Sequence, residues 1–390
     1  MTTKENHNSK RSPKYLFHPF EIVLCGYSGS GKTTLITRLI EKMRARYKIG
    51  YVKHDAHRFR MDHEGKDTFK SWMAGAEQVF IFDSEHSATI HRGRPSLIEQ
   101  RAALSNCDFI FLEGYKNSSS PKIVFIDIEE KILENVREGQ IENVVAYVGQ
   151  KENHLSVEPY FHRDNLDGFI QFVEASLRKR IPALNGLVLT GGKSTRMGSD
   201  KALLYYLDKP HGEVVMEMLK PYCENVFLSS RQGQWVNGEF SSCPQIYDRF
   251  LDFGPMGGVL SAMKAHPDNA WLVVACDLPH LEPSTLEVLI QNRNPYRFAT
   301  AFRSQINDLP EPLCAIYEPK SYLRLLEFLG MGYECPRKFL IHSDSILLSL
   351  KNEKALENAN YVEEFKKISV EIQKARKSAE VQKFEKEARA

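Results

Sequence analysis

Two glycine-rich loops, one in each half of the chain, constrain what this sequence can fold into. The first, residues 26–33 (Gly-Tyr-Ser-Gly-Ser-Gly-Lys-Thr), lies between an apolar stretch and a segment with helical periodicity. The second, residues 189–201, begins where another apolar stretch ends. Successive backbone N–H groups in such a loop converge on phosphate oxygens, because small residues let the ligand approach. The sequence therefore predicts two separate phosphate-binding sites on one polypeptide.

The length of 390 residues favours two domains, because single hydrophobic cores rarely grow so large. A basic run at residues 178–180 and the break at Pro182 place the boundary between them. We expect a disordered polar N-terminus at 1–19, a first domain at 20–180, a second at 181–365 and a charged helical tail at 366–390. The tail carries apolar residues at three- and four-residue steps, and the pattern leaves open whether it packs on the body.

Charge and hydropathy exclude several classes of protein. The 52 Lys and Arg residues nearly balance the 50 Asp and Glu residues, so no overall basic surface indicates nucleic acid. The longest apolar runs, such as residues 271–276, are too short to cross a bilayer, and residues 1–19 have no apolar signal core. Seven cysteines without a Cys-x-x-Cys pair are typical of reduced thiols. We expect a cytoplasmic protein with neither nucleic-acid nor membrane partners.

Apolar segments alternate with helical ones along both halves, which predicts layered α/β domains. The helices expected next to the loops and the boundary cover residues 32–47 and 167–179. The strands expected in the first half cover residues 21–25, 51–53, 78–82, 109–112, 122–127 and 144–148. Those expected in the second half cover residues 187–190, 226–229, 245–247, 271–275, 299–302 and 314–317.

The first loop matches the G-x-x-x-x-G-K-[ST] pattern of P-loop proteins in its proper context. Lys32 would reach the β- and γ-phosphates of a nucleotide, and the Thr33 hydroxyl would ligate Mg²⁺. Glu113 ends an apolar strand and is either a water-orienting carboxylate or an exposed strand-end residue. The candidate nucleotide-binding residues are Gly26, Ser28, Gly29, Gly31, Lys32, Thr33 and Thr34.

The first half leaves two questions of ligand identity open. It has no Asn-Lys-x-Asp motif for guanine, so the residues alone do not decide between GTP and ATP. The stretch at residues 53–67 is rich in His and Asp. It is either a metal site or, as is more common beside a nucleotide, a polar contact surface.

The second loop has a different arrangement of glycines and cations. Gly191 and Gly192 remove the Cβ atoms that would block phosphate, while Arg196 and Lys201 can neutralise departing pyrophosphate. Asp277 follows an apolar strand, where ligands of α/β sheets collect, and is the candidate Mg²⁺ ligand; its alternative role is a turn cap. Asp248 precedes a second glycine-rich segment, residues 254–258.

Both halves resemble known families. Residues 26–35, 53–57, 65–67, 74–76, 113–115 and 121–123 resemble the molybdopterin-guanine dinucleotide biosynthesis adaptor family. Residues 189–192, 196–198, 200–201, 248, 254–258, 276–279, 311–313 and 358–360 resemble the molybdenum cofactor guanylyltransferase family. Ser229 and Ser230 stand where that second family tends to have Asn, and residues 360–362 depart from its Asn-Thr-Pro ending.

These resemblances imply a P-loop NTPase domain followed by a Rossmann-like nucleotidyltransferase domain. They imply GTP and Mg²⁺ as ligands, with GMP transferred to molybdopterin or Mo-molybdopterin. Further partners would be molybdopterin-handling proteins and molybdoenzyme chaperones. The second resemblance assigns GTP contacts to Leu189, Thr190, Gly191, Lys201, Asp248 and Asp277, with Mg²⁺ also on Asp277. It places the Gly192 loop closer to guanine-selecting members than to cytidylyltransferases.

Two alternative functions remain open from the residues. One is a sugar-phosphate nucleotidyltransferase fused to a P-loop kinase, which would phosphorylate a small molecule with ATP. The other is a GTP-regulated scaffold with a degenerate second site. Pyrophosphate release in the presence of molybdopterin and GTP separates both from the guanylyltransferase hypothesis.

Overall fold

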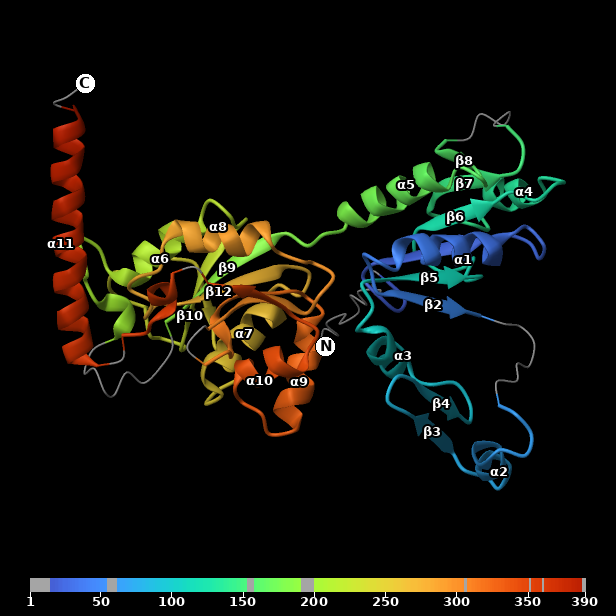
Figure 1. Ribbon diagram of the computed structural model, residues 1–390, viewed down its shortest axis with the longest axis horizontal. Helices are drawn as coiled ribbons and strands as arrows, with labels where there is room; N and C mark the ends of the chain where they lie inside the picture. Colours follow the sequence, from blue (N-terminus) through green and yellow to red (C-terminus); the bar gives the residue numbers. More distant parts are fainter. Residues whose placement is uncertain are drawn as a thin grey trace, which may run out of the picture. The chain divides into compact units, whose positions relative to one another are not determined.

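A computed structural model describes residues 15–54, 62–152, 158–190, 200–304, 307–350, 352–359 and 361–387. The chain divides into two compact units, residues 1–180 and 181–390 (Figure 1). Both units are α/β, which confirms the predicted fold class. None of the helices in the described ranges combines the length and the apolar character that a bilayer span requires.

The first unit contains, in chain order, β1 (Glu21–Cys25), α1 (Lys32–Met43), β2 (Ile49–Lys53), α2 (Asp67–Met73), β3 (Gln78–Phe82), β4 (Ser87–His91), α3 (Leu97–Leu104), β5 (Phe109–Glu113), β6 (Lys122–Phe125), α4 (Ile132–Arg137), β7 (Val144–Gly149), β8 (Tyr160–His162) and α5 (Leu166–Arg178). Six of these strands form a parallel sheet in the order β2-β5-β1-β6-β7-β8. Every residue of β1 and β5 is buried, as expected for central strands of a parallel sheet covered on both faces.

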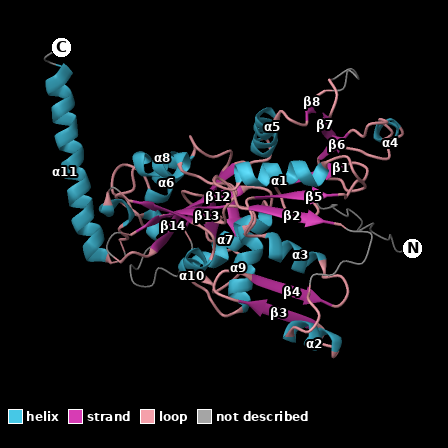
Figure 2. Ribbon diagram, turned by 45° about the vertical axis from the view of Figure 1, so that its right-hand side comes forward, coloured by secondary structure: helices cyan, strands magenta, loops and turns pink. Residues whose placement is uncertain are grey.

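The prediction for residues 78–82 was right about the strand and wrong about its sheet. β3 pairs antiparallel with β4, which the sequence analysis missed, and the two form a sheet of their own (Figure 2). Most β3 side chains are exposed, including Phe80 and Phe82. An apolar run alone predicts a strand but does not specify which strand it pairs with.

Three predicted boundaries in this unit need correction. The first helix ends at Met43 rather than at residue 47. Tyr47 lies beyond the helix, and its ring packs edge-on against Phe109. The strand predicted at 122–127 ends at Phe125, because the Asp127 carboxylate accepts backbone N–H groups at the start of α4. Of the N-terminal segment expected to be disordered, residues 15–19 are described, and Phe17 is buried.

The second unit contains β9 (Leu184–Leu189), a 3-10 turn (Lys201–Leu203), α6 (His211–Leu219), β10 (Val226–Ser230), β11 (Gln245–Tyr247), α7 (Gly254–Ala265), β12 (Ala270–Ala275), α8 (Pro283–Gln291), β13 (Ala299–Arg303), β14 (Pro310–Tyr317), α9 (Ser321–Gly330), α10 (Pro336–His342), β15 (Ile346–Ser349), a second 3-10 turn (Glu353–Leu356) and α11 (Val362–Glu387). The sheet order is β11-β10-β9-β12-β14-β13-β15, and β14 runs antiparallel to both neighbours. The chain leaves β9 toward β10 and later returns to its other side as β12. The carboxyl ends of β9 and β12 therefore flank a topological switch point, where ligands of such sheets bind.

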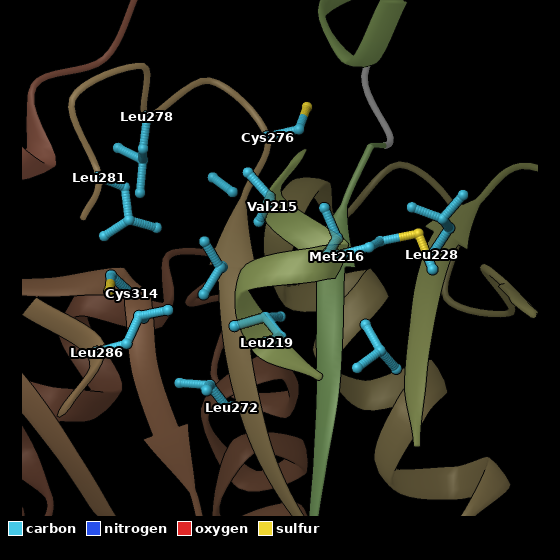
Figure 3. Packing of buried hydrophobic residues seen from close by; sticks show 14 of the residues in the cluster. Val215, Met216, Leu219, Leu228, Leu272, Cys276, Leu278, Leu281, Leu286 and Cys314 are labelled. Atoms are coloured by element: carbon cyan, nitrogen blue, oxygen red, sulfur yellow. The ribbon is translucent and has the colours of Figure 1, made fainter. Parts of the chain in front are cut away.

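Side chains of β12 alternate between two hydrophobic clusters on the two faces of this sheet. Leu272 belongs to the cluster shared with α6 and α8, which Figure 3 shows from close by. Trp271 belongs to the other cluster, shared with α7, α9 and α10. This alternation follows from the two-residue period of a strand. Close packing on both faces fixes the position of β12, which ends shortly before Asp277.

The charged tail predicted at 366–390 belongs to α11, which begins earlier, at Val362. The Phe365 ring packs edge-on against Tyr206, with ring centroids 5.0 Å apart. The first turn of α11 therefore contacts the body of the second unit, while the packing of residues 366–390 stays an open question.

Candidate functional site

The predicted residues of the first site lie together in the loop between β1 and α1 and in the first turn of α1. They are Gly26, Ser28, Gly29, Gly31, Lys32, Thr33 and Thr34. Gly31, the residue before α1, has φ of 89°, a left-handed conformation that favours glycine. The buried Lys32 ammonium donates to the Tyr27 carbonyl at 2.7 Å and lies 3.4 Å from the Ser30 hydroxyl. Burial lowers the Lys32 pKa, and nearby Glu113 partly opposes this shift.

A buried carboxylate stands beside this loop at the end of β5. The Thr33 hydroxyl donates to Glu113, 3.0 Å from Oε2, and the Tyr51 hydroxyl donates to the same oxygen at 2.6 Å. Burial and the carboxylate together raise the Tyr51 pKa, so the phenol remains a donor at neutral pH. Glu113 is therefore not an exposed strand-end residue. Its role as a water-orienting carboxylate stays a prediction.

Arg163, which the sequence analysis missed, reaches the same loop from β8. Its Nη2 atom lies 3.5 Å from the Ser30 carbonyl and 2.0 Å from the point where a Cβ on Gly31 would lie. No sequence motif identifies this arginine as a site residue. It lies 133 residues from Ser30 in the chain, and only the folded sheet brings its side chain to the loop.

Part of the His- and Asp-rich stretch that was considered for metal binding lies outside the described residues, at 55–61. Within the described ranges, no three His, Cys, Asp or Glu side chains are grouped to hold a metal ion.

The second site forms at the switch point between β9 and β12. The Lys201 ammonium lies 2.9 Å from Asp277 Oδ2, and both side chains are largely buried. Asp277 Oδ1 is buried and has no hydrogen-bond partner among the described residues. Leu189 ends β9, and the hydroxyl of the next residue, Thr190, donates to the Ser229 carbonyl at 2.6 Å. The predicted Gly191, Gly192 and Arg196 lie outside the described residues, in 191–199.

Asp248 stands at the end of β11, two strands away from β9. The Ser229 hydroxyl donates to its Oδ1 at 2.7 Å. Burial raises the Asp248 pKa, and this hydrogen bond partly opposes the shift. Ser229, recorded in the sequence only as a departure from a family pattern, therefore orients a predicted site residue.

α7 approaches this region closely through a glycine. A Cβ on Gly258 would lie 2.6 Å from the Ser229 hydroxyl and 2.8 Å from Leu189 Cδ2. Only a residue without a side chain allows the helix to pack here.

Asp200 is a further acidic residue of the site that the sequence analysis quoted without assigning it a role. The Gln234 amide donates to its Oδ2 at 2.8 Å, whereas Oδ1 is buried without a partner among the described residues. Burial raises the Asp200 pKa. Trp235, next to Gln234, donates its indole N–H to the Thr190 hydroxyl at 3.3 Å.

A small cavity of about 60 Å³ lies beside Leu278, the residue that follows Asp277. The Ala359 N–H donates to the Asp277 carbonyl at 3.0 Å, which holds residues 352–359 against the site. Leu278, Asn358, Glu311 and Arg337 line the cavity, and the Arg337 guanidinium lies 3.4 Å from the Glu311 carboxylate.

Comparison with known proteins agrees with this division. The family model described as "MobA-like NTP transferase domain" matches residues 186–346, and that of "Molybdopterin guanine dinucleotide synthesis protein B" matches residues 21–150. A probable molybdenum cofactor guanylyltransferase of Flavobacterium johnsoniae is 30% identical over 137 residues, 35% of this chain and 70% of that protein. The chain belongs to the molybdenum cofactor guanylyltransferase family. Its first unit carries the domain of synthesis protein B, so both predicted resemblances are confirmed.

Two other relatives complete the comparison. The molybdenum cofactor biosynthesis bifunctional protein of Synechocystis sp. is 38% identical over 186 residues, 48% of this chain and 54% of that protein. The chain thus spans about half the length of this relative. A crystal structure of molybdopterin-guanine dinucleotide biosynthesis protein A from Archaeoglobus fulgidus is 21% identical, covers 49% of this chain and 99% of its own, and has a TM-score of 0.42.

Proposed function

We propose that the second unit transfers GMP from GTP to molybdopterin or Mo-molybdopterin and releases pyrophosphate. The observation that carries this proposal is the Lys201–Asp277 pair at the switch point of the sheet. A cation and a carboxylate placed there suit a nucleoside triphosphate whose outer phosphates depart as an anion. Family membership supports guanine as the base.

The acidic groups of the site fit a magnesium ion. Asp277 Oδ1 and Asp200 Oδ1 are both buried oxygens without partners among the described residues. Buried polar atoms are normally satisfied, and carboxylate oxygens are ligands that Mg²⁺ prefers. Asp277 would hold the ion, which when bound supplies positive charge to the phosphate oxygens of the substrate.

Transfer needs positioning more than acid–base chemistry. A phosphate oxygen of molybdopterin forms the new bond to the α-phosphorus of GTP, and the bond from that phosphorus to pyrophosphate breaks. The attacking phosphate is already an anion at neutral pH, so no general base is required. Lys201 neutralises the charge that collects on pyrophosphate, with Arg196 of the glycine loop as the second cation. Leu189, Thr190 and Asp248 would contact the nucleotide.

The small cavity beside Asp277 is a candidate contact for the second substrate. Arg337 lines this cavity together with Leu278, the residue after Asp277. Arginine suits an anionic phosphate because its planar group donates two parallel hydrogen bonds.

The first unit is proposed to be a GTP-binding adaptor in which Thr33 ligates Mg²⁺ and Lys32 holds the phosphates. The loop, the Thr33–Glu113 contact and the matched family model support this role. Fusion keeps the adaptor at high effective concentration beside the transferase. Molybdopterin-handling proteins and molybdoenzyme chaperones are the further partners we propose, and the cytoplasm is the proposed location.

One assay tests the central proposal. Purified protein is mixed with Mg²⁺, molybdopterin and each nucleoside triphosphate separately, and pyrophosphate release is followed. We expect pyrophosphate release when GTP and molybdopterin are both present, and none with any other nucleoside triphosphate. Omitting molybdopterin should also abolish the release. Release with a sugar 1-phosphate in place of molybdopterin would support the sugar nucleotidyltransferase instead. No release under any condition would support the scaffold hypothesis.

A further inference from the structure

The first unit shows on which side of its loop a nucleotide carries its terminal phosphates. All six strands of the main sheet are parallel, so their carboxyl ends share one edge. β5 and β2 lie on one side of β1. β5 supplies Glu113, which accepts from the Thr33 hydroxyl, and β2 supplies Tyr51, whose hydroxyl donates to Glu113. The lysine and the threonine of a P-loop hold the outer phosphates and the metal. We therefore expect a nucleoside on this loop to lie on the other side, over β6, β7 and β8.

Arg163 lies on that other side, and its neighbours anchor it there. Its backbone N–H donates to the Gly149 carbonyl at the end of β7, at 2.9 Å. The ring nitrogen Nε2 of His162 lies 2.8 Å from the Gln150 carbonyl, and Asp164 pairs with Arg38 of α1 at 3.6 Å. These contacts connect the ends of β7 and β8 to each other and to the middle of α1.

The Arg163 side chain then extends back over the loop. Its Nη2 atom fills the space against Gly31, close to the Ser30 carbonyl. A guanidinium keeps its charge at any physiological pH and offers five donors in a plane. Ribose hydroxyls and α-phosphate oxygens are acceptors that leave the loop at this point, so their chemistry matches the donors.

We infer that Arg163 contacts the ribose and α-phosphate of a nucleotide bound to the residue 26–33 loop, on the side opposite Thr33 and Glu113. This inference rests on the proposed nucleotide binding by the first unit. It supplies a nucleoside-side contact in a domain whose sequence lacks a recognisable base-reading motif.

The test compares two ligands on the full-length chain, GDP and tripolyphosphate, each with Mg²⁺, by isothermal titration calorimetry. Tripolyphosphate carries the phosphate chain without a nucleoside. The second unit is also proposed to bind phosphates. The binding that is lost in Lys32→Ala is therefore taken as the contribution of the first unit. Arg163→Ala and Arg163→Lys are compared with Arg137→Ala, a matched control at the exposed end of α4.

We expect Arg163→Ala to weaken Lys32-dependent GDP binding by about 10- to 100-fold, the range for a lost charge-assisted hydrogen bond. Tripolyphosphate affinity should fall less than GDP affinity, because this ligand keeps the α-phosphate contact but has no ribose. Arg163→Lys should be intermediate, and Arg137→Ala should match the wild type. Equal loss for both ligands would place Arg163 on the phosphate chain alone, without a ribose contact, and unchanged GDP affinity would remove it from the site; either result overturns the inference. A wild-type chain that binds no more GDP than Lys32→Ala would refute nucleotide binding by the first unit itself.

Discussion

The Lys201 ammonium and the Asp277 carboxylate lie 2.9 Å apart, although 76 residues separate them in the chain. Asp277 follows β12, and Lys201 opens the 3-10 turn after the glycine loop that leaves β9. Because β9 and β12 are parallel neighbours, their carboxyl ends bring the two residues together. In the proposed function, Lys201 would contact the phosphate chain of the substrate, and Asp277 would bind the accompanying cation.

Asp277→Asn should lower GMP transfer by about 100-fold or more, because it removes the charge that holds the cation while keeping the shape of the side chain. The measurement is pyrophosphate release with GTP and molybdopterin. GDP binding that depends on Lys32 serves as the internal control and should not change, because that site lies in the first unit. Undiminished transfer would remove Asp277 from the mechanism.

Gly258→Ala should reduce both stability and transfer, because its Cβ would lie 2.6 Å from the Ser229 hydroxyl that orients Asp248. Overpacking of this kind costs about 1–3 kcal/mol in unfolding free energy. Gly330→Ala, at the end of α9, is the matched control, since nothing lies within 4 Å of its Cβ position. Urea unfolding and a steady-state transfer assay report the two effects. Equal behaviour of the two variants would show that the close approach is unimportant.

Arg293→Leu should destabilise the second unit by about 3–5 kcal/mol, because it leaves a buried carboxylate without its partner. Arg293 donates to both oxygens of Glu318, at 2.7 and 3.0 Å, and Glu318 is 1% exposed. Replacing both residues with Leu should cost less than the sum of the single changes. The exposed pair Arg303 and Asp308 is the control, where Arg303→Ala should change unfolding by at most about 1 kcal/mol. Additive losses at the buried pair would contradict this account.

The stability of the second unit should fall as the pH drops below about 6.5, the ordinary pKa of histidine. Burial lowers the pKa of His211, and its contacts with the Leu278 carbonyl and the charge of Asp277 only partly oppose this. The unfolded chain therefore binds a proton at a higher pH than the folded chain does. The contribution of His211 to the free energy of unfolding is fully present above the pKa that it has in the unfolded chain. This contribution is lost as the pH falls toward the lower pKa that it has in the folded chain.

The measurement for His211 is urea unfolding between pH 7.5 and 5.5, followed by tryptophan fluorescence. His211→Gln should flatten the slope by at most about 1.4 kcal/mol per pH unit, the limit for one proton. Identical slopes in the two proteins would show that other groups control the acid sensitivity.

Local pattern was sufficient to predict the first loop and most strands, while residues 191–199 of the second loop lie outside the described residues. β1 and β12 are largely apolar runs that end at Cys25 and Ala275, so both strands could be predicted without a structure. β4, β8 and β15 were missed because short or polar strands owe their stability to pairing with neighbours rather than to their own composition. β3 was assigned to the wrong sheet for the same reason.

The order of residues along the chain was enough to place Lys32 and Thr33 on the first loop and to put a carboxylate at the end of β5. Which side chains approach those residues depended on strand order, and strand order is a property of the folded sheet. Arg163 reaches Ser30 across 133 residues, and Ser229 reaches Asp248 between neighbouring strands. Such contacts have no local signature, because a side chain's partners are set by the packing of elements that are distant in sequence.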